Sequence, residues 1–130
     1  PAAMTAHVVF SDIDAEHPAS TSDRIVKDII RGEIGFDGLL MSDDLSMKAL
    51  RGVMKGRAEA VIRAGSDVAL HCNGDLSEMR EAAAGVPQLS GRAHERFAAA
   101  CALAGTATHF DESEAVALLS ALMSRETRVV

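Results

Sequence analysis

The sequence contains three short aliphatic runs about 30 residues apart, and this spacing limits the possible folds more than any other feature. The runs are Ala-His-Val-Val-Phe at 6–10, Gly-Leu-Leu-Met at 38–41 and Asp-Val-Ala-Leu-His-Cys at 67–72. None of them alternates strictly between apolar and polar residues, which is typical of strands buried on both faces. Helical patterns lie between the runs. The order strand, helix, strand, helix, strand predicts an α/β fold in which successive βα units form a parallel sheet.

Capping and stop residues delimit the predicted helices. Ser20 or Ser22 is placed to cap the first helix, and Gly35 is placed to end it. The second helix covers 57–64 and stops at Gly65. Three more helical stretches follow the third strand, at 76–84, 91–104 and 112–123. The last two carry apolar stripes, so each is expected to pack one face against another element.

Charge and composition exclude several classes of function. The chain has 13 basic and 19 acidic residues and a net charge of −6, which argues against a nucleic-acid or anionic-membrane partner. The sequence shows neither a membrane-spanning stretch nor a signal peptide, so we expect a soluble protein that is not exported. Cys72 and Cys101 lie in apolar runs and are expected to be buried free thiols. No two histidines have the i, i+4 spacing of a helical metal site, so no metal is predicted.

Acids and amides follow each predicted strand, where parallel α/β folds collect their reactive groups. They are Ser11, Asp12 and Asp14 after the first strand, Ser42, Asp43 and Asp44 after the second, and Asn73 and Asp75 after the third. The triplet at 42–44 has two interpretations. One of its residues caps a helix, or a carboxylate held at the strand end acts as nucleophile, base or metal ligand.

Other residues near these strand ends also have two interpretations. His7 and His71 point either into a core or toward a ligand. Asn73 begins what is most simply a turn followed by a helix cap, and Met41 fills a gap in a core. All of these residues lie close to the predicted rim of strand ends.

Several motifs resemble one known family. They are Met-Thr-Ala-His-Val at 4–8, Arg-Gly-Glu-Ile-Gly-Phe-Asp-Gly at 31–38, Met-Ser-Asp-Asp-Leu-Ser-Met-Lys-Ala at 41–49, Ala-Gly-Ser-Asp-Val at 64–68 and His-Cys-Asn-Gly-Asp at 71–75. In this order they resemble the bacterial β-N-acetylhexosaminidases of glycoside hydrolase family three. The resemblance covers nearly all of residues 4–105.

The resemblance implies a TIM (β/α)₈ barrel, of which residues 1–123 would be the C-terminal portion and 124–130 a frayed tail. It implies a cytoplasmic glycosidase, without cofactor or metal, that removes β-linked N-acetylglucosamine from muropeptides with retention of configuration. Asp43, the first aspartate of its motif, is then the nucleophile, and Asp44 is a cap or a supporting group. The candidate substrate-pocket residues are His7, Met41, Asp44 and Asn73.

The chain also departs from the family. The loop Lys-His-Phe-Pro-Gly-His, which carries the family's acid/base histidine, does not occur in it. Three βα units are moreover too few to close a barrel of about 250 residues. We therefore expect little turnover from these residues alone, and a missing N-terminal barrel half as a partner. The alternatives are a non-catalytic α/β domain whose acidic rim (Asp12, Asp14, Asp43, Asp44) binds Mg²⁺ or a phosphorylated ligand, and a remnant that serves only as an interaction surface.

Overall fold

A computed structural model describes residues 2–104 and 110–126, with side chains up to Met123. Its centre is an open sheet of three parallel strands, β1 (Ala2–Met4), β2 (Leu39–Asp44) and β3 (Val68–Leu70), in the order β1-β2-β3. In the register, Ala3 lies opposite Leu40, and Met41 lies opposite both Met4 and Val68. The prediction of an α/β fold with a parallel sheet is confirmed.

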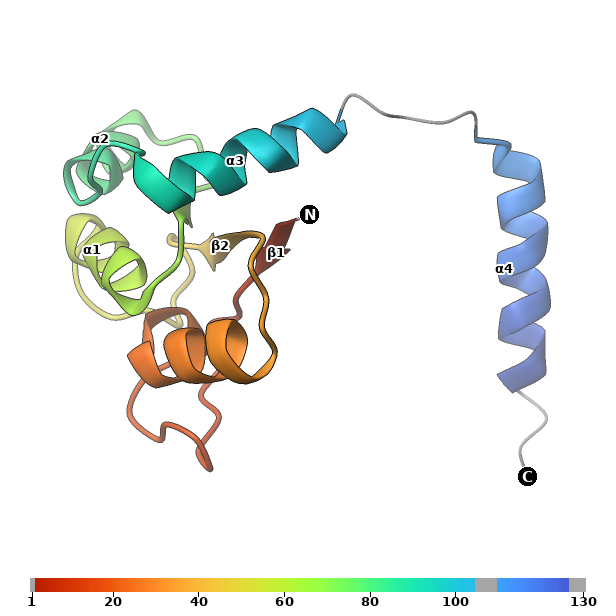
Figure 1. The fold of residues 1–130 in the computed structure, drawn as a ribbon, viewed down its shortest axis with the longest axis horizontal. Helices are drawn as coiled ribbons and strands as arrows, with labels where there is room; N and C mark the ends of the chain where they lie inside the picture. The colour runs from red at the N-terminus through yellow and green to blue at the C-terminus, as the bar shows by residue number, and fades with distance from the viewer. Residues whose placement is uncertain (1, 105–109, 127–130) are drawn as a thin grey trace.

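Helices connect and follow the strands (Figure 1). Between β1 and β2 lie a short helix, η1 (Ala19–Thr21), and η2 (Arg24–Glu33). The helix α1 (Met54–Ala64) joins β2 to β3, and α2 (Leu76–Ala84), α3 (Gly91–Ala104) and α4 (Glu112–Glu126) follow. The predicted helices thus exist, and α4 continues three residues into the segment expected to be a tail, whose residues 127–130 lie outside the described ones.

The expected start and stop residues occupy the helix ends. Asp23 occupies the N-cap position of η2, and it is Ser22 rather than Ser20 whose Oγ accepts a backbone N–H of this helix, that of Ile25 at 3.2 Å. Gly35 and Gly65 both adopt positive φ, at 68° and 116°. At Gly65 a Cβ would lie 3.0 Å from a methyl group of Val26, so only glycine fits without strain.

The core lies between the sheet and its helices. One cluster of buried residues joins the turn after β2 to α1, and it consists of Leu45, Leu50, Met54, Ala58 and Val61. A second joins η2, β2 and the end of α1 through Val26, Leu40 and Ala64. At the amino-terminal end of the strands, Asp67 forms ion pairs with Arg31 and Arg96, which ties η2 and α3 to the sheet.

The predicted strand boundaries are wrong at several ends. The first strand was expected at 6–10, but β1 ends at Met4, and Val8, Val9 and Phe10 are about half exposed. The backbone of this run instead contacts η1, since the carbonyl of Val8 accepts the N–H of Ala19 at 2.8 Å. The second strand extends to Asp44, beyond its predicted end, and the third is shorter than the run at 67–72. Local hydrophobicity could not specify which part of a run would pair with a neighbour.

The helices α3 and α4 do not bury their apolar stripes within the described residues. No residue of α3 is buried, and Phe97 is 43% exposed. The stripe of α4 is exposed, and this helix stands away from the sheet (Figure 1). Both cysteines are exposed as well, so the prediction of buried thiols is wrong: Cys72 follows the end of β3, and Cys101 lies on the uncovered α3. Among the described residues, no helix is long and apolar enough to cross a membrane.

Candidate active site

The residues at the carboxyl ends of the three strands form the candidate site. Those that follow β1 differ from the predicted ones. Because β1 ends at Met4, the residues that follow it are Thr5, Ala6 and His7, and Asp12 and Asp14 lie farther along a loop. Asp43 and Asp44 are the last two residues of β2. His71, Cys72 and Asn73 follow β3. The rim thus combines two carboxylates with two histidines and an amide.

A β-bulge shapes the end of β2. Met41 pairs with Val68 and Asp44 with Leu70, so β2 has one more residue than β3 between these pairs. Ser42 lies inside the bulge, fully buried, and its Oγ accepts the backbone N–H of Leu70 at 3.0 Å in place of a main-chain carbonyl. Bulges redirect the side chains beside them. This bulge therefore sets the direction of Asp43.

Asp43 is half-buried and keeps one carboxylate oxygen available. Its Oδ1 accepts the backbone N–H of Asp44 at 2.8 Å, and its main-chain oxygen accepts the hydroxyl of Ser42 at 2.7 Å. Within the described ranges, Oδ2 has no hydrogen-bond or ion-pair partner. An anchored carboxylate with one free oxygen can act as a nucleophile or a base.

Asp44, in contrast, is fully occupied by structural hydrogen bonds. Its Oδ1 accepts the backbone N–H groups of Ser46 at 3.0 Å and of Cys72 at 3.1 Å, and Oδ2 accepts the hydroxyl of Ser46. Burial opposes ionisation of this carboxyl, but the hydrogen bonds from Ser46 and Cys72 outweigh it and lower the pKa of Asp44. Asp44 therefore holds a turn rather than capping a helix, and it links β2 to the end of β3.

His7 is buried, and both of its ring nitrogens have protein partners. Nε2 donates to the main-chain oxygen of Asp44 at 3.0 Å, and Nδ1 shares a hydrogen bond with the hydroxyl of Ser20. The ring therefore connects the end of β1 to the end of β2. Of the two interpretations of this histidine, the structure supports the buried, satisfied one.

The end of β3 forms a second polar cluster. Glu78 on α2 accepts hydrogen bonds at one oxygen from His71 Nε2 at 3.0 Å and from the amide of Asn73 at 2.5 Å. These two bonds lower the pKa of Glu78. Asp75 caps α2 by accepting the backbone N–H groups of Ser77 and Glu78, so the predicted turn and cap at 73–75 are confirmed.

The acidic rim of the alternative function is not assembled. Asp14 accepts hydrogen bonds from Ser22, Glu16 and His17 instead of joining Asp43 and Asp44. Within the described ranges, no group of three or more His, Cys, Asp or Glu side chains is arranged to hold a metal ion. The structure thus gives the cation-binding alternative no support.

Comparison with known proteins places the chain in a family. Residues 1–102 match the family model described as the glycosyl hydrolase family 3 N terminal domain. The chain belongs to glycosyl hydrolase family 3. From the sequence we expected these residues to form the C-terminal part of the family barrel. The match instead assigns them to the N-terminal domain of the family. The open three-stranded sheet is a part of that family 3 domain.

Several family 3 relatives are similar to part of this chain. A β-hexosaminidase of Bordetella pertussis is 44% identical over 80 residues, which are 60% of this chain and 22% of that protein. One from Shewanella frigidimarina is 47% identical over 72 residues, 54% of this chain and 21% of that protein. The crystal structure of a β-N-acetylhexosaminidase from Beutenbergia cavernae has a TM-score of 0.56 at 36% identity and covers 64% of this chain and 25% of its own. The chain spans about a fifth to a quarter of the length of these relatives.

Sequence reasoning did not identify two residues that form important contacts in this family 3 chain. Nothing in the sequence around Arg31 indicates a partner, but its side chain is 16% exposed and pairs with Asp67. Glu78 was not considered, although it lies on the first turn of the helix that follows β3, seven residues after His71. That position, just beyond a strand that ends in His and Asn, was the available signal.

Proposed function

We propose that this chain supplies the nucleophile of a retaining β-N-acetylhexosaminidase and that the nucleophile is Asp43. One observation carries the proposal: Asp43 is anchored through Oδ1 at the bulged carboxyl end of β2 and keeps Oδ2 without a partner in the described structure. Membership of family 3 and similarity to proteins named β-hexosaminidase support the reaction class. The chain is proposed to form part of the barrel in the N-terminal domain of this family.

In the proposed reaction, Asp43 Oδ2 attacks the anomeric carbon of a terminal β-linked N-acetylglucosamine. The bond from that carbon to the leaving oxygen breaks, and the leaving oxygen receives a proton from a general acid. Water, activated by the same group acting as base, then attacks the glycosyl ester and releases the sugar with its configuration retained. Asp43 thus ends ionised, as it began.

The other rim residues are assigned supporting roles. Asp44 and His7 position the end of β2, because each is bonded to the backbone of a neighbouring segment. Met41 and Asn73 are proposed to contact the sugar. Met41 lies two residues before Asp43 on the same strand, and the Asn73 side chain is exposed at the neighbouring strand end.

The proton donor is proposed to come from a segment outside this chain. His7 has both nitrogens bonded within the protein, and His71 binds Glu78 through Nε2. Without acid/base assistance a glycosidase typically loses about 10² to 10⁴-fold in rate. The substrates are proposed to be N-acetylglucosamine-containing peptidoglycan fragments, hydrolysed in the cytoplasm during cell-wall recycling.

The first test compares two polypeptides with a chromogenic β-N-acetylglucosaminide. The 130-residue chain is assayed alone and after joining to the preceding barrel segment of a family 3 β-hexosaminidase. We expect hydrolysis only from the joined polypeptide, because it alone contains the proton donor. Robust hydrolysis by the short chain would contradict the division of the site.

The second test identifies the nucleophile. Asp43→Asn in the joined polypeptide should lower kcat by at least about 10³-fold, because an amide cannot form the ester intermediate. Asp12→Asn, which makes the same change on an exposed loop residue, should have no effect. A fluorinated N-acetylglucosaminide that traps the intermediate should label the peptide containing Asp43, as read by mass spectrometry. Full activity of Asp43→Asn, or a label on another residue, would refute the assignment.

A further inference from the structure

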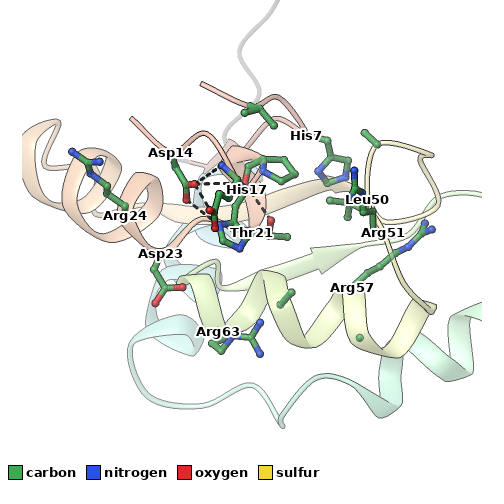
Figure 2. A pocket seen from close by; sticks show the side chains of 16 residues that line it. His7, Asp14, His17, Thr21, Asp23, Arg24, Leu50, Arg51, Arg57 and Arg63 are labelled. Atoms are coloured by element: carbon green, nitrogen blue, oxygen red, sulfur yellow. Dashed lines mark hydrogen bonds and ion pairs between the residues drawn. The ribbon is translucent and has the colours of Figure 1, made fainter. Parts of the chain in front are cut away.

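A cavity of about 630 Å³ lies beside the rim and is not explained by the nucleophile. It is lined by the loop between β1 and η1, the end of η1, the start of η2, the turn after β2 and helix α1 (Figure 2). His7 lines it and also bonds to the main-chain oxygen of Asp44, so the cavity borders the strand that carries Asp43. Neither Asp43 nor Asp44 lines this cavity.

The two ends of the cavity differ in charge. Arg51 and Arg57 stand at one end, and Asp14 and Asp23 stand at the other, with His17 between them (Figure 2). The acidic end is already compensated within the protein. Asp14 receives hydrogen bonds from Ser22 and His17, and Asp23 pairs with Lys27 at 2.7 Å. The lining also contains one further acid, Glu16, and two further arginines, Arg24 and Arg63.

The arginine end has no such compensation. The guanidinium of Arg57 is held by main-chain oxygens alone, with Nε on Gly52 at 2.9 Å and Nη1 on Leu45 at 2.8 Å and Met47 at 3.3 Å. Carbonyl groups fix this side chain in place without neutralising it. In the described part of the chain, Arg57 Nη2 and the whole guanidinium of Arg51 have no hydrogen-bond or ion-pair partner. A chain of net charge −6 therefore keeps two uncompensated cations at one end of a cavity.

We propose that this cavity binds a small molecule through a carboxylate, held by Arg57 and Arg51. Arginine presents planar pairs of N–H donors that match a carboxylate, and a guanidinium fixed in advance loses less entropy on binding. The ligand class is therefore a small carboxylate, such as an amino acid or a short peptide.

The position of the cavity connects this site to the hydrolase. The connection rests on the proposed function: a carboxylate-bearing peptide on the leaving group of an N-acetylglucosaminide would occupy the cavity while the sugar lies at Asp43. The binding step itself requires no hydrolysis. Arg51 and Arg57 are then specificity-determining residues that select a leaving group with a free carboxylate.

The test titrates the 130-residue chain with the dipeptide alanyl-alanine and, separately, with its carboxyl-terminal amide, at constant ionic strength. Binding is followed by NMR chemical-shift changes at cavity residues such as Leu50 and Ala60. We expect saturable binding of the dipeptide with a Kd on the order of millimolar, and about tenfold weaker binding of the amide, which lacks the charge. Equal binding of the two ligands, or no saturation by about 20 mM, would overturn the proposal.

Matched variants locate the site. Arg51→Gln and Arg57→Gln should each weaken dipeptide binding by about tenfold. Arg80→Gln removes the same charge from the exposed surface of α2, outside the cavity, and should leave the Kd within about twofold. Arg51 has no partner within the described part of the chain, so Arg51→Gln tests the site even where Arg57→Gln does not fold. An equal effect of Arg80→Gln and Arg51→Gln would show non-specific attraction and refute the site. Asp43→Asn should leave the dipeptide Kd unchanged, because Asp43 does not line the cavity. The binding proposal can therefore be tested even if the hydrolase proposal fails.

Discussion

The two ends of the sheet treat their carboxylates in opposite ways. At the amino-terminal end, Asp67 is 5% exposed, pairs with Arg31 at 2.8 Å and Arg96 at 2.9 Å, and accepts the backbone N–H of Leu40 at 2.9 Å. At the carboxyl end, hydroxyl and backbone N–H groups hold Asp43 and Asp44, and neither has an arginine partner among the residues that the structure describes. The first end uses charge pairs to fasten helices to the sheet, while the second leaves one oxygen of Asp43 free. In α/β barrels, stability and catalysis are divided between the same two ends.

The largest expected effect is a loss of stability when the ion pairs at the amino-terminal end of the sheet are removed. Asp67→Ala leaves Arg31 and Arg96, both mostly buried, without their shared carboxylate and removes the acceptor of the Leu40 N–H. Removing one partner of a buried ion pair typically costs about 3–5 kcal/mol, so we expect a loss of this size in the free energy of unfolding, measured with urea.

The control for this variant is Asp37→Ala. Asp37 also pairs with Arg96, but its side chain is 57% exposed. Solvent screens exposed ion pairs, so Asp37→Ala should cost far less stability than Asp67→Ala. Equal losses for Asp37→Ala and Asp67→Ala would show that burial does not distinguish the two carboxylates, and the comparison between the ends would lose its basis.

A smaller effect separates the two carboxylates of the carboxyl end. Asp44→Ala removes the acceptor that holds Ser46 and links β2 to Cys72, and should cost about 1–3 kcal/mol in urea unfolding. Asp43→Asn should change stability by less than about 0.5 kcal/mol, because its carboxylate has one neighbouring contact. Stability losses in the reverse order would assign the structural role to Asp43 and leave Asp44 as the candidate nucleophile.

The sequence was sufficient for the order of elements and for several helix ends, because these depend on local chemistry. Gly65 ends α1 since only glycine tolerates its backbone there, and Asp75 caps α2 through its own side chain. The position of β1 was not predictable, because the run at 6–10 is more β-branched than Ala2–Met4, and only pairing with β2 selects the latter. Spacing alone does not select the ion pair at Glu59 either: Arg63 lies four residues after it, but Glu59 pairs with Lys55 at 3.7 Å.

The candidate site was predictable in part for a related reason. The motif at 42–44 located the carboxylates at a strand end, but which of the two remains free depends on a bulge and on Cys72, 28 residues farther along the chain. Neither the neighbours of Arg51 in the sequence nor its spacing from Arg57 shows that both arginines line the same cavity. The features of the site that the sequence did not predict are those that arise from contacts between distant segments.

The smallest expected effect tests whether hydroxyl groups on the carboxyl side replace the arginines of the other end. The hydroxyl of Ser22 donates to Asp14 at 2.7 Å, and together with the backbone N–H of Glu16 and the groups of His17 it lowers the pKa of Asp14 from 3.8 to about 2. Ser22→Ala should raise this pKa toward 3.8, as measured by NMR titration of the carboxyl carbon.

The sign of the pH dependence follows from that direction. A carboxyl whose pKa is lower in the folded state stabilises the fold above its unfolded value of 3.8, and this contribution is lost as the pH falls toward about 2. The difference in urea midpoint between the native chain and Ser22→Ala should therefore narrow over this interval. Part of the difference should persist at low pH, because the hydroxyl of Ser22 also accepts the backbone N–H of Ile25 at the start of η2. An Asp14 pKa that Ser22→Ala leaves unchanged would show that the backbone N–H groups alone hold the carboxylate, and that hydroxyls do not substitute for arginine on this side of the sheet.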